Sequence, residues 1–77
     1  MRDVGVLKFN ADDGRWHNFK GDWAHAISIT SGEAIWLEVE GCVTLQRTRM
    51  EFDHDMKRYY SVDDYPLRDG LKVSASA

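Results

Sequence analysis

The segment between residues 34 and 45 most constrains how this chain can fold. Ile35, Leu37 and Val39 alternate with residues of the opposite parity, and the pair Glu40-Gly41 separates this run from a second apolar run over 42–45. A period of two is typical of strands, and a two-residue turn containing Gly joins antiparallel strands. The segment therefore predicts a tight β-hairpin. Because Gly41 would hold a positive φ, we expect Gly41→Val to damage folding more than Gly5→Val in an extended strand.

The rest of the chain predicts further short strands at 4–9, 15–19, 23–29, 42–52, 58–62 and 71–73, separated by turns rich in Asn, Asp and Gly. Residues 22–25 also allow one helical turn. Apolar character changes parity between Leu45 and Thr48, which predicts a β-bulge near Gln46-Arg47. The pattern indicates an all-β, mainly antiparallel fold, either a small curled sheet or an SH3-like or OB-like barrel of five or six strands.

A chain of 77 residues is expected to form a single domain over residues 1–77, with a frayed C-terminal tail at 74–77 and loose residues at 1–3. The strand parities predict which side chains form the core. These are Ile35, Leu37, Val39, Val43, Leu45, Phe52 and Val62.

Composition limits the function classes. The net charge of −3 opposes broad attraction to nucleic-acid phosphates. A lone Cys42 excludes an intramolecular disulfide, and there is no apolar run typical of a signal peptide or membrane span. These features predict a cytoplasmic protein that does not associate with membranes.

Several short patterns occur together along the chain: Ser31-Gly32-Glu33-Ala34-Ile35, Thr48-Arg49-Met50-Glu51-Phe52, Tyr59-Tyr60-Ser61-Val62 and Leu67…Gly70-Leu71-Lys72-Val73. Together they resemble a family of short bacterial and phage proteins known only as a domain of unknown function. That family shows a G-[DE]-x-[IL] strand entry, then R-[IVM]-E-[YF], Y-Y-x-V and a closing L-x-G-L-x-V. The resemblance covers about residues 5–73, although Cys42-Val43 stands where the family usually has an aromatic residue. It implies a small β-fold and an origin in phages or mobile elements, and no activity.

No catalytic or cofactor-binding motif is present in the sequence, so we expect a protein that is not an enzyme and has no cofactor. Asp53-His54-Asp55 offers carboxylates and an imidazole, but side chains that alternate along an extended loop converge poorly on one cation. His17 and His25 are expected at the surface or its boundary, and Cys42 as a half-buried small side chain.

Binding is the remaining class of function. Carboxylates fall at predicted turns and would form an acidic surface for a basic protein, with three aromatic anchors beside it. The predicted partner-binding residues are Glu38, Glu40, Asp53, Asp55, Asp63, Asp64, Trp23, Trp36 and Tyr65. An inhibitor of a host defence complex, in the style of anti-CRISPR proteins, would fit this description. The alternative is a single-stranded nucleic-acid module that stacks bases on aromatic residues and uses Arg47, Arg49 and Arg58. An edge strand could also pair two copies of the chain.

Overall fold

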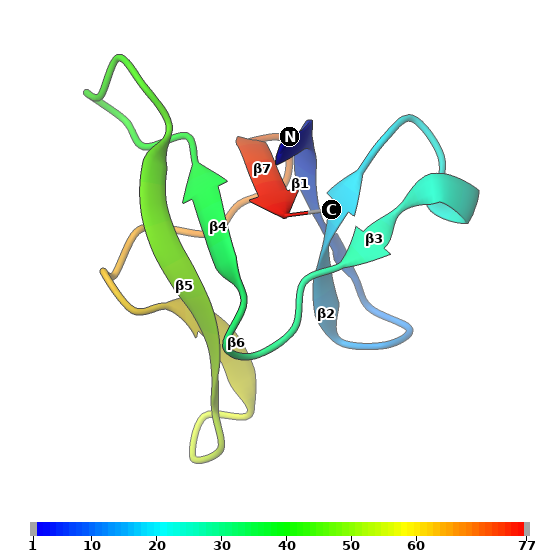
Figure 1. Ribbon diagram of the computed structural model, residues 1–77. Helices are drawn as coiled ribbons and strands as arrows, with labels where there is room; N and C mark the ends of the chain where they lie inside the picture. The colour runs from blue at the N-terminus through cyan, green and yellow to red at the C-terminus, as the bar shows by residue number, and fades with distance from the viewer. Residues whose placement is uncertain (1, 77) are drawn as a thin grey trace.

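A computed structural model describes the backbone of residues 2–76 and the side chains of residues 4–75. The fold is all-β, as the alternation predicts (Figure 1). Its elements are β1 (Arg2–Asn10), β2 (Arg15–Phe19), a single 3₁₀ turn η1 (Trp23–His25), β3 (Ile27–Ser28), β4 (Ala34–Leu37), β5 (Gln46–Asp53), β6 (Arg58–Ser61) and β7 (Lys72–Ser76).

The strands form one antiparallel sheet in the order β3-β2-β1-β7-β4-β5-β6. The C-terminal strand β7 therefore lies in the middle and joins a unit of β1, β2 and β3 to a unit of β4, β5 and β6 (Figure 1). The outer strands β3 and β6 are not paired with each other. The sheet is thus curled but open, with seven strands in place of the five or six expected.

The core lies on the inner face of this curled sheet. Its buried side chains come from both units and from β7, and they are Leu7, Ile29, Ile35, Leu37, Met50, Val73 and Ala75. Burial of a continuous apolar face supplies the main stabilising term in a chain this short. Among residues 2–76, no helix has the length and hydropathy that crossing a bilayer requires.

The predicted hairpin exists, but its connection is longer than predicted. β4 and β5 pair from Ala34↔Arg49 to Leu37↔Gln46, so residues 38–45 form a loop rather than continued strands. Within that loop the Cys42 N–H donates to the Val39 carbonyl at 3.0 Å and Gly41 has a φ of 86°, so the turn is centred at the predicted pair. Because 42–45 lies outside β5, the parity change at Gln46 marks the start of the strand and not a bulge.

Two other expectations about elements were wrong. Residues 23–29 do not form one strand, and the alternative of a helical turn at 22–25 is the one that forms. Asp22 caps a 3₁₀ turn by accepting the His25 N–H at 2.9 Å, and only Ile27–Ser28 is a strand. The tail is not frayed over 74–76, because β7 pairs with β1 on one side and β4 on the other. Met1 and Ala77 lie outside the described residues.

The prediction of the core was right for only some of the residues it named. Ile35 and Leu37 are fully buried, but Val43 is fully exposed in the 38–45 loop and Val62 is exposed just after β6. Val39, Leu45 and Phe52 are half-buried.

Candidate binding groove

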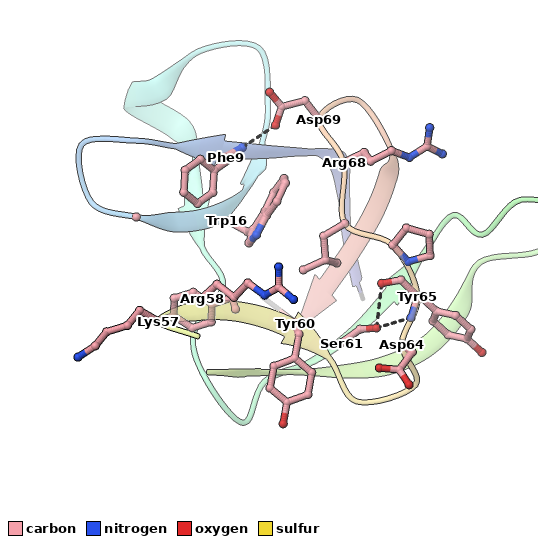
Figure 2. Close-up of a pocket in the computed structure, with 14 residues that line it drawn as sticks. Phe9, Trp16, Lys57, Arg58, Tyr60, Ser61, Asp64, Tyr65, Arg68 and Asp69 are labelled. Carbon is pink, nitrogen blue, oxygen red and sulfur yellow. Dashed lines mark hydrogen bonds between the residues drawn. The ribbon is translucent and has the colours of Figure 1, made fainter. Parts of the chain in front are cut away.

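A depression lies at the open side of the sheet. It has a volume of about 920 Å³ and separates the β1–β2 hairpin from β6 and from the loop that follows β6 (Figure 2). We call it the aromatic groove. Its lining residues are Phe9, Gly14, Trp16, Lys57, Arg58, Tyr59, Tyr60, Ser61, Asp64, Tyr65, Pro66, Leu67, Arg68 and Asp69. This volume falls within the range of pockets that hold drug-sized ligands or short segments.

One wall of the aromatic groove is the end of the β1–β2 hairpin. Phe9 and Trp16 are directly paired across the two strands, and their ring centroids lie 5.2 Å apart in an edge-to-face arrangement. Phe9 keeps 41% of its surface exposed, whereas Trp16 packs partly against the core. An aromatic pair that is held this way offers a rigid apolar surface with little entropy left to lose on binding.

The floor and one end of the groove are formed by residues 64–69, which return from β6 toward β1. The Ser61 hydroxyl accepts the Tyr65 N–H at 2.7 Å and lies 3.1 Å from the Tyr65 carbonyl, to which it donates (Figure 2). At the other end the Asp69 carboxylate accepts the Phe9 N–H at 2.8 Å. These contacts tie the loop to both walls, so the groove is preformed in the free protein.

The opposite wall is the free edge of β6. Five consecutive residues, 57–61, line the groove, and this indicates that it runs along the strand's edge, because a sheet face would contribute alternate residues only. The Val62 N–H donates to the Arg49 carbonyl at 3.0 Å, so the even-numbered residues of β6 direct their backbone groups to β5. The backbone groups of Tyr59 therefore point to the free edge, where no strand of the described chain pairs with them. Ser61 has the same orientation, but it is buried and its carbonyl accepts the Asp64 N–H.

The groove is locally more basic than the whole chain. Lys57, Arg58 and Arg68 line it together with Asp64 and Asp69, whereas the full sequence has a net charge of −3. The charges are also separated along β6, since Lys57 and Arg58 lie at its start and Asp64 lies beyond its end. In Figure 2 the Arg58 side chain extends toward Trp16, while Tyr60 points the other way.

The predicted acidic surface is spread over several places. Its residues belong to three separate loops: Glu38 and Glu40 follow β4, Asp53 and Asp55 join β5 to β6, and Asp63 and Asp64 follow β6. The first two loops lie at opposite ends of the β4–β5 pair (Figure 1).

Some of these carboxylates have structural partners within the fold. The Glu38 side chain accepts the Lys72 N–H at 2.9 Å, and that of Asp53 accepts the N–H groups of Asp55 and Met56 at 2.9 and 3.1 Å. Of the predicted acidic set, Asp64 lines the groove.

The predicted aromatic anchors are also distributed. Tyr65 lines the groove, whereas Trp23 packs edge-to-face on His17 and Phe19 with centroid distances of 5.4 and 5.0 Å. Trp36 lies on the outer face of β4, with the Arg47 guanidinium 5.9 Å from its ring centroid.

The three arginines of the nucleic-acid alternative do not form one stripe. Arg58 lines the groove, but Arg47 and Arg49 lie on the outer face of β5, where Arg49 pairs with Glu51 at 2.7 Å. No cluster of three potential metal ligands occurs among the described residues, and the Asp53-His54-Asp55 segment forms a turn.

One side-chain hydrogen bond supports the turn beside the groove. His17 Nε2 lies 2.9 Å from the Asp13 carboxylate, and His17 itself is buried rather than at the surface. Desolvation raises the pKa of Asp13, but the Arg15 N–H, the hydrogen bond to His17 and the charges of His17 and Arg15 outweigh it, so the net pKa is lowered. The cluster stabilises the β1–β2 turn that carries Gly14 into the groove wall.

Comparison with known proteins adds a family to this description. A family model described as a domain of unknown function, DUF5348, matches residues 5–75. The chain belongs to the DUF5348 family. No curated protein and no solved structure shows significant similarity to it. The expected membership in a family of unknown function is therefore confirmed, and the groove of this DUF5348 chain is interpreted from its own geometry.

Sequence reasoning missed most of the groove residues of this DUF5348 chain. The aromatic residues of the groove come from three strands: Phe9 from β1, Trp16 from β2 and Tyr59 from β6. β2 and β6 are not paired with each other. The only local signal is the symmetric placement of Phe9 and Trp16 on either side of the first turn. Their meeting with Tyr59 depends on the curl of the whole sheet.

Proposed function

We propose that this protein is a non-catalytic binding module that holds an extended segment of a partner protein in the aromatic groove. The observation that carries the proposal is the combination of a preformed aromatic wall, Phe9 and Trp16, with the unpaired edge of β6 facing it. A sheet edge binds an extended chain through main-chain hydrogen bonds, and neighbouring pockets select its side chains.

The charge distribution also supports a protein partner. A net charge of −3 repels a polyphosphate chain at long range, whereas a peptide segment can match the basic start of β6 and the acidic residues beyond its end. Basic residues of the partner would contact Asp63 and Asp64. Inhibition of a host complex by a phage or mobile-element protein is the biological role we propose for such a module.

A second candidate is a single-stranded nucleic-acid module. The observation that favours it is that Phe9, Trp16 and Tyr59 line the same groove as Lys57 and Arg58, because bases stack on aromatic rings beside cationic side chains. Arg47 and Arg49 would take no part in such a site, since both lie on the outer face of β5.

The test is selection of random decapeptides displayed on phage against the immobilised full chain, with single-stranded oligonucleotides titrated in parallel at about 150 mM salt. We expect enriched peptides that bind the native chain and lose affinity for Phe9→Ser. Val43→Ser also removes an exposed apolar side chain, but Val43 lies in the 38–45 loop and does not line the groove, so this variant is the matched control. Peptides that bind both variants equally would contradict the proposal. Oligonucleotide binding without peptide enrichment would favour the second candidate.

A further inference from the structure

The free edge of β6 also indicates what kind of segment it accepts; this step rests on the proposed function. We propose that the bound segment adds antiparallel to β6 as an eighth strand and carries an apolar residue followed directly by a carboxylate. The apolar residue lies opposite Tyr59, and the carboxylate lies beside Arg58.

The register follows from which backbone groups are available. Ser61 is fully buried and its carbonyl already accepts the Asp64 N–H at 3.0 Å, so the main-chain groups left at the edge are the Tyr59 N–H and the Tyr59 carbonyl. In an antiparallel pair one residue of the added strand exchanges both of its bonds with Tyr59. That residue is fixed opposite Tyr59, and this pair of bonds sets the register.

Side-chain direction follows from this register. Directly paired residues point to the same face of a sheet. Tyr59 pairs with Phe52, their ring centroids are 4.9 Å apart, and Tyr59 packs against the core. The residue opposite Tyr59 therefore points to the inner face, toward Trp16 across the groove. A large apolar or aromatic side chain would bury its surface between these two rings.

The charge requirement follows from Arg58. In an antiparallel strand, the residue after the one opposite Tyr59 lies opposite Arg58, next to Lys57. Both cations line the groove, and neither has an acidic partner in the described structure. Arg58 extends toward Trp16 (Figure 2), so its guanidinium can reach a carboxylate on the added strand. The reverse order, with the acid first, would place the carboxylate opposite Tyr60 and nearer to Asp64.

The experiment uses the full chain and blocked hexapeptides followed by amide NMR titration. The parent peptide is Thr-Thr-Phe-Glu-Thr-Thr. The first comparison peptides replace Glu by Lys or exchange the order of Phe and Glu. We expect the parent to shift the amides of residues 57–61 and to bind about fivefold or more tightly than either comparison peptide.

Backbone methylation tests strand addition itself. N-methylation of the Phe nitrogen removes the donor to the Tyr59 carbonyl, and we expect at least about a tenfold loss of affinity. N-methylation of the Glu nitrogen, which points away from β6, is the matched control and should change affinity by less than about twofold. Equal effects of the two methyl groups would overturn the strand-addition model.

A charge exchange tests the register from the protein's side. Arg58→Glu should reverse the preference so that the Phe-Lys peptide binds more tightly than the Phe-Glu peptide. Arg47→Glu makes the same charge change on an exposed residue of β5 outside the groove and should leave the preference unchanged. An unchanged preference in Arg58→Glu would overturn the register.

These outcomes separate the inference from the proposed function. If peptides selected by display bind the groove but tolerate methylation at every position, or contain no carboxylate, the inference fails and the binding module stands. If neither selected nor designed peptides shift the groove amides, both fail.

Discussion

At the scale of single residues, Gly5 shows how a close approach of two strands restricts a position that looks permissive. A Cβ at Gly5 would lie 2.1 Å from the Asn18 side-chain oxygen and 2.6 Å from the Phe19 carbonyl oxygen. Asn18 is fully buried on the neighbouring strand, so neither obstacle can move freely. At Gly41, by contrast, an added Cβ meets open space, and only the positive φ opposes substitution.

We therefore predict that Gly5→Ala destabilises the fold by about 3 kcal/mol or more, as overpacking does in a tight interior. Gly41→Ala should cost about 1 kcal/mol, which is typical of a non-Gly residue with positive φ. Chemical denaturation of the two variants measures the difference. The sequence predicted the reverse order, with substitution at Gly41 more damaging than at Gly5. Equal denaturation midpoints for the two variants would show that β1 and β2 can move apart at Gly5.

The Asp13–His17 pair gives a pH prediction. The folded-state pKa of Asp13 is lowered from its ordinary value of 3.8, so its ionised form favours the folded state. Its contribution is fully present above pH 3.8 and is lost as the pH falls through the lower folded-state pKa. We expect native stability to fall more steeply with acidification below about pH 4 than the stability of Asp13→Asn. Thermal melts across this pH range measure the difference. Parallel curves of melting temperature against pH for the two proteins would show that the pair does not contribute to stability.

At the scale of elements, the β4–β5 hairpin carries the centre of the core. Leu37 is fully buried at the end of β4 and faces β7 through its pairing with Val73. We predict that Leu37→Ala lowers the free energy of unfolding by about 2–5 kcal/mol. Val43→Ala, in the exposed part of the connecting loop, should change it by less than about 0.5 kcal/mol. Urea denaturation of both variants checks the contrast.

The loop that forms the groove floor depends on one hydroxyl. Ser61→Ala leaves the Tyr65 N–H without its side-chain acceptor, and we predict a loss of about 1–2 kcal/mol together with faster hydrogen exchange at Tyr65. Ser74→Ala is the matched control, because Ser74 is equally buried and its hydroxyl has no hydrogen-bond partner in the described structure. A similar loss in both variants would mean that the loop is held by packing alone.

At the scale of the whole molecule, the single strand β7 connects the two halves of the sheet. β7 is the last strand in the chain, yet it lies between β1 and β4 and joins the two three-stranded units. Removal of residues 72–77 should therefore abolish cooperative folding rather than trim a tail, since each remaining unit would expose its half of the core. Circular dichroism and thermal melting of the truncated chain test this. A retained β spectrum with a sharp transition would contradict it.

The sequence by itself determined the local structure of this protein. Alternation of apolar residues indicated β4, β5 and β6, and the turn at Glu40 and Gly41 was placed correctly, because strand period and turn dihedrals depend on neighbouring residues. Local signals also indicated the all-β class and the family. They left a strand and a helical turn open at 22–25, where the Asp22 cap decided for the turn. They failed at Val43, because the pairing of β4 with β5 does not extend to that residue.

The tertiary structure alone decided the aromatic groove. Phe9 and Trp16 meet β6 only because β7 inserts between β1 and β4 and the sheet then curls without closing. Strand order and closure depend on contacts between residues far apart in the chain, which no local period encodes. For the same reason, carboxylates that each lie at a turn ended up at different ends of the sheet, and the backbone groups of Tyr59 were left at a free edge.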